Sequence, residues 1–185
     1  GSGFNKFVVE SFIDEIAHAA GTDPVQLRLR LLAKHPRGQR IIEKVAEMSG
    51  WGRPVAEGRA LGFAYADIWR TPVAGAAEVS VNAQTGLIRV HKFWNAVNPG
   101  IVVNPDIVVQ QSESNVVWGI SQALKERVTF KDGAVQQSNY HDYPVLRMSE
   151  VPEIVTEVIS TGDRPTGIGE IVLPVASVIV NPNQP

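Results

Sequence analysis

The chain has 185 residues, 44% of them hydrophobic and 19% charged, with a formal net charge of −2. This composition is typical of a folded domain with a sizeable core, and the charge gives no sign of nucleic-acid or anionic-membrane binding. No cysteine is present, which excludes disulfides, thiolate zinc sites and cysteine-ligated iron–sulfur clusters from this chain. The sequence contains no run of about 18 apolar residues, so no membrane span is predicted. No two histidines have the spacing of metal ligands.

The first third of the sequence has the apolar periodicity of helices. Apolar side chains recur at intervals of three and four over residues 7–20, which predicts a helix that ends at Gly21. Asp23 and Pro24 form a capping residue followed by a first-turn proline, and they predict the start of a second helix ending near residue 32. A third helix is predicted over 37–49, followed by a polar connector over 53–61.

From residue 62 onward the pattern changes to alternation. Strands are predicted over 62–68, 75–81 and 87–96, and the turn at 82–86 makes the last two the clearest hairpin. Asn98-Pro99-Gly100 has the composition of a turn. The rest is predicted as a long helix over 107–125, a short hairpin of 128–130 with 135–136 and a strand over 153–160.

Helices followed by hairpin-linked strands indicate an α+β fold with a mixed sheet and a long packing helix. We expect a helical segment over residues 4–50 and an α/β segment over 60–185. The chain opens directly on a helix, and a final helix has barely begun where it stops. We therefore expect a fragment of a larger subunit.

The stretch Arg164-Pro165-Thr166-Gly167-Ile168-Gly169-Glu170 is the strongest candidate for a functional loop. Pro174 predicts a helix directly after it, and glycine permits a close approach of the backbone to a ligand. The dinucleotide fingerprint fails because its third glycine position is Val172, and no P-loop lysine follows. The residues alone leave open whether Glu170 is functional or only faces the positive end of the next helix.

Several stretches together resemble one family. They are 5–15, Gly50-Trp51-Gly52, 104–108, 135–143 and the Gly-x-Gly-Glu loop. This set resembles the molybdenum hydroxylases of the xanthine oxidase family, in the C-terminal molybdopterin-binding region of large (beta) subunits of the isoquinoline 1-oxidoreductase type. The resemblance covers residues 1–185.

The resemblance implies a cofactor and a reaction. The cofactor is molybdenum on a pterin dithiolene, in bacterial relatives usually molybdopterin cytosine dinucleotide. The reaction hydroxylates an electron-poor carbon of an N-heterocycle or aldehyde with oxygen from water. Glu170 falls on the family's general base, which takes a proton from a metal-bound hydroxyl, and Gly167, Ile168 and Gly169 fall on the cofactor-binding loop. A carboxylate in a dry pocket suits this role at neutral pH.

Gln111 falls on a family glutamine near the metal and its pterin. The sequence departs from the family directly after it, because Ser114 and Asn115 replace glycines and Ser112 replaces a larger residue. Gln111 is either a cofactor contact or a polar residue in the first turns of a helix. The polar-aromatic run 139–143 is interpreted as a loop held by side-chain to backbone hydrogen bonds rather than a base or metal site.

The resemblance also implies partners: a missing N-terminal part of the same subunit, a small iron–sulfur subunit and a small-molecule substrate. We expect this chain alone to lack the cofactor and to be inactive. The alternative is a cofactor-free interaction domain that retains the fold, which the changes at 112–115 favour and the retained Glu170 loop opposes. Either the periplasm or the cytoplasm of a bacterium fits the sequence.

Overall fold

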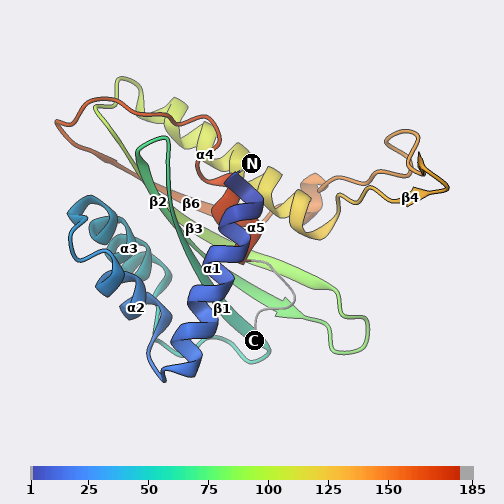
Figure 1. The fold of residues 1–185 in the computed structure, drawn as a ribbon, viewed down its shortest axis with the longest axis horizontal. Helices are drawn as coiled ribbons and strands as arrows, with labels where there is room; N and C mark the ends of the chain where they lie inside the picture. Colours follow the sequence, from blue (N-terminus) through green and yellow to red (C-terminus); the bar gives the residue numbers. More distant parts are fainter. Residues whose placement is uncertain (1, 180–185) are drawn as a thin grey trace.

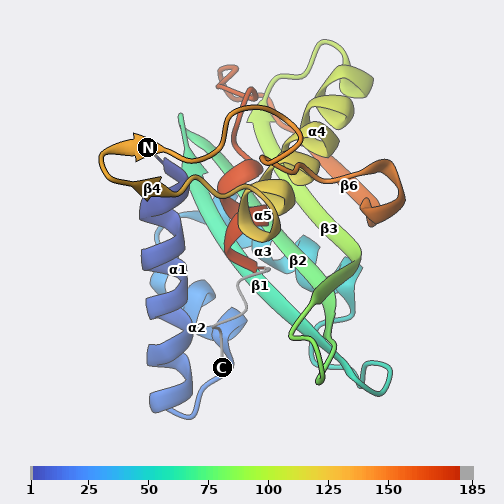
Figure 2. The ribbon, with the colours of Figure 1, turned by 90° about the vertical axis from the view of Figure 1, so that its right-hand side faces the viewer.

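The computed structural model describes residues 2–179 as a mixed β-sheet with helices on both faces (Figures 1 and 2). The helices over 24–31 and 36–49 pack on one face and those over 105–124 and 173–179 pack on the other, whereas the first helix, over 2–19, packs mainly against the last one. The helices are α1 (Ser2–Ala19), α2 (Pro24–Leu31), α3 (Pro36–Ser49), α4 (Pro105–Leu124) and α5 (Leu173–Ile179).

The main sheet has the order β1-β2-β3-β6. Its strands are β1 (Arg59–Ile68), β2 (Thr71–Val81), β3 (Ile88–Gly100) and β6 (Glu153–Ser160). The first three are antiparallel neighbours, whereas β6 lies parallel to β3 after the chain has crossed over through α4. This confirms the α+β class and the mixed sheet. A small hairpin, β4 (Phe130–Lys131) with β5 (Ala134–Val135), extends from the body, and a short 3-10 helix (Met148–Glu150) precedes β6.

Alternation along β1 divides the core between the two faces of the sheet. Phe63 and Tyr65 join a cluster with apolar residues of α2 and α3, whereas Ala64 and Ala66 join a cluster with α4 and α5. Successive strand residues point to opposite faces, so a single strand supplies both clusters. The helices over 24–49 share one of these clusters with the sheet, since α3 packs on β2 and β3.

A buried ion pair fixes α1 to its neighbours. Arg28 of α2 donates from Nε to Glu10 Oε2 at 2.9 Å, and the same carboxylate oxygen accepts from the backbone N–H of Tyr65 at 2.8 Å. Arg28 also reaches Asp14 Oδ1 at 2.6 Å. Three elements therefore meet at one carboxylate. Within residues 2–179 no helix has the length and hydrophobicity that a membrane crossing requires.

The sequence prediction for Asn98-Pro99-Gly100 was wrong. These residues are not a turn but the end of β3, buried beneath the segment that leads to Glu170. Gly100 has φ +84°, and a Cβ there would lie 2.6 Å from the carbonyl oxygen of Arg164. Composition indicated a turn because proline and glycine favour turns, but here they permit close packing of two backbones. β1 and β2 also begin earlier than predicted, at Arg59 and Thr71; β2 does so because only two residues join it to β1.

Candidate active site

The loop that carries Glu170 lies across the ends of strands β2 and β3. Beyond β6, the backbone N–H of Thr161 donates to Gly100 O at 3.0 Å, and the N–H of Ile101 donates to Asp163 O at 3.0 Å. The backbone N–H of Thr166 then donates to Pro99 O at 2.9 Å. The incoming half of the loop is thus bonded through its backbone to the end of β3.

A pair of threonines fastens the loop to the start of β2. The hydroxyl of Thr71, which is fully buried, lies 2.7 Å from the hydroxyl of Thr166. The Thr71 hydroxyl also lies 2.5 Å from the carbonyl oxygen of Gly167, to which it donates. Buried hydroxyls are costly unless hydrogen-bonded, so this pairing favours one position of the loop.

Helix α4 holds the outgoing half of the loop. The side-chain amide of Gln111 donates to Gly169 O at 2.6 Å, and that of Asn115 donates to the same oxygen at 2.9 Å. The structure therefore brings together Gln111 and the Gly-x-Gly-Glu loop, two sites that the sequence places far apart. This contact gives Gln111 a defined place beside Glu170, although its role toward a cofactor stays a prediction.

Of the three residues at 112–115 that depart from the family, two are buried and one is exposed. Asn115 is buried, and its Oδ1 accepts from the backbone N–H groups of Val172 at 3.2 Å and Leu173 at 3.3 Å, where α5 begins. Ser112 is also buried, and its hydroxyl donates to Val108 O at 2.8 Å. Ser114 is exposed. Ser112 and Asn115 therefore fill internal space, and Asn115 helps to support the loop.

Glu170 itself is exposed. It lies in a bend just before α5, as predicted, and within residues 2–179 its carboxylate has neither a hydrogen bond nor an ion pair. A Cβ placed on Gly169 would meet nothing within 4 Å, so the space beside that backbone is open. The side chain of Ile168 instead packs against the core. The carboxylate is thus free to act on a ligand, and its backbone is fixed on both sides.

The polar-aromatic run 139–143 is held by Asp142, as the sequence interpretation requires. Its carboxylate accepts from the backbone N–H of Ser138 at 2.9 Å and from that of Asn139 at 3.0 Å. These hydrogen bonds lower the pKa of Asp142, those from the Asn139 backbone contributing most. Within residues 2–179 no three His, Asp or Glu side chains gather as a metal site.

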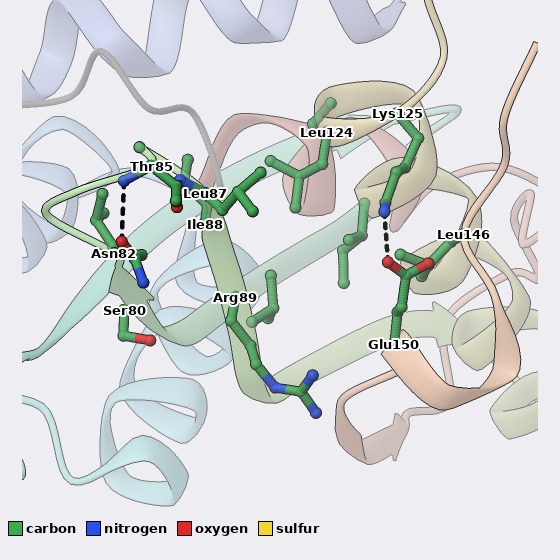
Figure 3. A pocket seen from close by; sticks show the side chains of 15 residues that line it. Ser80, Asn82, Thr85, Leu87, Ile88, Arg89, Leu124, Lys125, Leu146 and Glu150 are labelled. Atoms are coloured by element: carbon green, nitrogen blue, oxygen red, sulfur yellow. Dashed lines mark hydrogen bonds and ion pairs between the residues drawn. The ribbon is translucent and has the colours of Figure 1, made fainter.

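A pocket of about 650 Å³ lies at the opposite end of the sheet. The end of β2, the start of β3 and the C-terminal part of α4 form it, and Figure 3 shows Leu87 and Leu124 near each other in it. Lys125 and Glu150 form an ion pair at its side. Neither Gln111 nor Glu170 lines this pocket, so it is separate from the candidate active site.

Comparison with known proteins gives consistent results. A family model described as "Molybdopterin cofactor-binding domain" matches residues 16–152, which include Gln111 and end before the Glu170 loop. The beta subunit of isoquinoline 1-oxidoreductase from Brevundimonas diminuta is 43% identical over 90% of this chain. A nicotinate dehydrogenase subunit from Pseudomonas putida is 36% identical over 96% of it. The chain spans only 22% and 16% of these two relatives.

Solved structures share the fold. Quinoline 2-oxidoreductase from Pseudomonas putida 86 superposes with a TM-score of 0.56 at 27% identity, over 62% of this chain and 16% of that one. The aldehyde oxidoreductase from Desulfovibrio desulfuricans has a TM-score of 0.53 at 19% identity, over 78% of this chain and 19% of that one. The second similarity concerns the fold alone.

The fold and the matching family model define a cofactor-binding domain of the α+β class. The chain belongs to the molybdopterin cofactor-binding domain family, within the xanthine oxidase family of molybdenum hydroxylases. The sequence indicated Glu170 and Gln111 as candidate site residues but did not indicate Thr71 or Asn115 as supports of the loop. No sequence signal marks Thr71, because its partner lies 95 residues away.

Proposed function

We propose that this chain is part of the molybdenum-cofactor-binding catalytic subunit of an oxidoreductase. The enzyme hydroxylates an N-heterocycle or an aldehyde with oxygen from water, and Glu170 is its general base. One observation carries the proposal: an exposed, unpaired carboxylate stands on a loop whose backbone is fixed by Thr71 on one side and by Gln111 and Asn115 on the other. Fixed backbone on both sides is what a positioned catalytic group requires.

The residues present fit a bound pterin cofactor. The space beside Gly169 is open, and Gln111 lies next to it with a side-chain oxygen that accepts no bond within residues 2–179. Gln111, Gly167, Ile168 and Gly169 would lie along the cofactor, which we propose to be the cytosine dinucleotide form. When bound, molybdopterin with molybdenum supplies oxygen transfer and a two-electron acceptor.

Glu170 accepts a proton at its carboxylate as the substrate carbon gains its oxygen. A positioned general base contributes roughly 10²–10⁴-fold to the rate. Its geometry depends on the loop, because a misplaced base loses much of its effect. The threonine pair and the two amides of α4 therefore act as positioning groups for this carboxylate.

The proposed enzyme needs more than this chain. The remainder of the subunit would complete the cofactor site, and a small iron–sulfur subunit would receive the electrons, because this chain has no cysteine to ligate a cluster. The cofactor-free interaction domain remains the second candidate. Its main support, the departure from the family at residues 112–115, is weaker because Ser112 and Asn115 are buried within the domain.

The test uses the longest native chain, produced with its partner subunit in a host that makes the cofactor. Elemental mass spectrometry measures molybdenum, and steady-state kinetics measure hydroxylation. We expect stoichiometric metal, and Glu170→Gln should retain it while turnover falls by roughly 10²–10⁴-fold. Glu57→Gln, at an exposed carboxylate in the connector before β1, is the matched control and should change neither value.

Two results would contradict the proposal. Absence of molybdenum from the long chain would leave the interaction domain as the better interpretation. Full turnover by Glu170→Gln would remove the assignment of the base even if the metal is present.

A further inference from the structure

The turn between β1 and β2 has an unusual backbone. Ile68 pairs with Thr71, so only Trp69 and Arg70 connect the strands. Both have left-handed φ values, +54° and +65°. Two-residue turns of this kind favour Asn-Gly or Asp-Gly, because residues with larger side chains are strained there. The sequence thus places a tryptophan and an arginine where local physics favours small residues.

The tryptophan is also unfavourably placed with respect to water. Trp69 is 74% exposed, and within residues 2–179 its indole makes no ring contact or hydrogen bond. By contrast, Trp51 packs edge-to-face on Phe63 and donates to Asp23. Strain and exposure at one residue are each unfavourable to the folded domain. Such combinations persist mainly where a residue serves function.

This turn lies against the Glu170 loop. A Cβ placed on Gly167 would come within 3.0 Å of the Cβ of Trp69 and 3.5 Å of its Cγ, so the side chain of Trp69 begins directly over that glycine. Thr71 lies two residues after Trp69. Its hydroxyl donates to Gly167 O and is hydrogen-bonded to the hydroxyl of Thr166. Trp69 is therefore held against a residue that lies three positions before the proposed base.

From this arrangement we infer that Trp69 is a specificity-determining residue of the same site, whose exposed indole binds a flat, electron-poor aromatic ring of the substrate. The inference rests on the proposed function, since it takes the ring to be the one hydroxylated near Glu170. The indole is electron-rich, and offset stacking on an electron-poor ring is its favourable geometry. Trp69 lies in the left-handed turn at the end of β1, where its side chain is exposed, and Gly167 leaves room for the Cβ and Cγ of that side chain.

The experiment separates binding from turnover. In the full holoenzyme carrying Glu170→Gln, the dissociation constant of quinoline is measured by calorimetry with and without Trp69→Ala. Trp69→Ala should weaken quinoline binding by roughly 2- to 10-fold, and Trp69→Phe should recover most of it. Trp118→Ala, at an exposed tryptophan on α4, is the matched control and should leave binding unchanged.

Steady-state kinetics of the enzyme with Glu170 intact then test substrate selectivity. Trp69→Ala should raise KM for quinoline relative to acetaldehyde, which has no ring to stack. Equal effects on both substrates would overturn the inference and leave Trp69 a structural residue. So would unchanged quinoline binding accompanied by lower metal content or a lower Tm, which would make the indole a packing contact for the rest of the subunit. Failure of the proposed function itself is seen separately, in the metal content and in the activity of Glu170→Gln.

Discussion

Asn115 connects the carbonyl of Gly169 to the first residues of α5. Its Nδ2 donates to Gly169 O at 2.9 Å while its Oδ1 accepts from Val172 and Leu173. A single buried amide therefore sets the spacing between the loop that carries Glu170 and the helix that follows it.

Replacing Asn115 should loosen this loop. Asn115→Ala removes this partner from the buried N–H of Val172, the partly buried N–H of Leu173 and the carbonyl of Gly169, and we expect a loss of about 1–3 kcal/mol in the free energy of unfolding. Asn115→Asp keeps the acceptor for Val172 and Leu173 but loses the donor to Gly169. Urea denaturation measures stability, and hydrogen exchange at Val172 and Leu173 should rise in the alanine variant more than in the aspartate variant. Equal exchange in both would contradict this interpretation.

The Glu10–Arg28 pair should be far more important to stability than any surface pair. Both side chains are at most 3% exposed, and loss of the Glu10 charge leaves the buried Arg28 guanidinium with one carboxylate fewer, its contact with Asp14 remaining. We expect Glu10→Gln to lower the free energy of unfolding by about 3–5 kcal/mol. Glu47→Gln, which breaks the exposed pair with Lys44 in α3, should cost less than about 1 kcal/mol. Comparable losses in urea denaturation would argue against the burial explanation.

Gly119 permits the close packing of α4 on α5. A Cβ there would lie 2.6 Å from Leu173 O and 2.7 Å from the Cβ of Ala176. We expect Gly119→Ala to destabilise the fold by about 1–3 kcal/mol through overpacking. Gly162→Ala is the control, because its Cβ would meet nothing within 4 Å, and its effect should stay within about 0.5 kcal/mol. Thermal denaturation of the two variants should show the difference, and equal melting temperatures would count against it.

The loop around Asp142 should depend on pH in the acid range. Backbone N–H groups of Asn139 and Ser138 lower the pKa of this carboxyl in the folded protein, so the ionised form favours the fold. That stabilisation is present above the ordinary pKa of about 3.9 and is lost as pH falls through the lowered folded value. The amide NMR shifts of Ser138 and Asn139 should follow this titration. Asp142→Asn should abolish it, and an unchanged titration in that variant would point to another group.

The turn at Trp69 and Arg70 should show a trade between stability and binding. Left-handed φ costs of order 1–3 kcal/mol per residue, so replacing the pair by Asn-Gly should raise the free energy of unfolding by about 1–2 kcal/mol. The same variant removes the indole and should weaken quinoline binding in the holoenzyme. Denaturation and calorimetry on one preparation measure both. A stabilised variant with unchanged affinity for quinoline would show that the strained turn at Trp69 and Arg70 does not serve substrate binding.

The sequence specified regular elements well where local signals agree with the final contacts. Residues 153–160 were predicted as a strand and form β6, since most of them are β-branched residues that favour strands. The helix predicted over 107–125 forms α4, which begins two residues earlier than predicted, at Pro105 after the N-cap Asn104.

The supports of the site were less accessible to such reasoning. Thr71 precedes the predicted strand 75–81, and nothing in its neighbours indicates a partner at Thr166. Asn115 could be seen as a departure from a family glycine, but its role needs the position of α5. Gly100 has turn composition, and only the packing of the loop above it explains its left-handed φ. Local patterns predict elements, whereas these contacts depend on how distant segments meet.

The anchoring of the Glu170 loop has a consequence for the order of folding. Its side-chain partners Gln111, Asn115 and Thr71 lie 58, 54 and 96 residues away along the chain from the atoms they bind. Contacts over such separations form only after much chain entropy has been lost, and therefore late. The proposed base should thus acquire its geometry in one of the last steps of assembly, when β2, β3 and α4 are already in place. An intermediate with a complete sheet would still lack a competent site. Catalytic activity would therefore appear only when folding is complete.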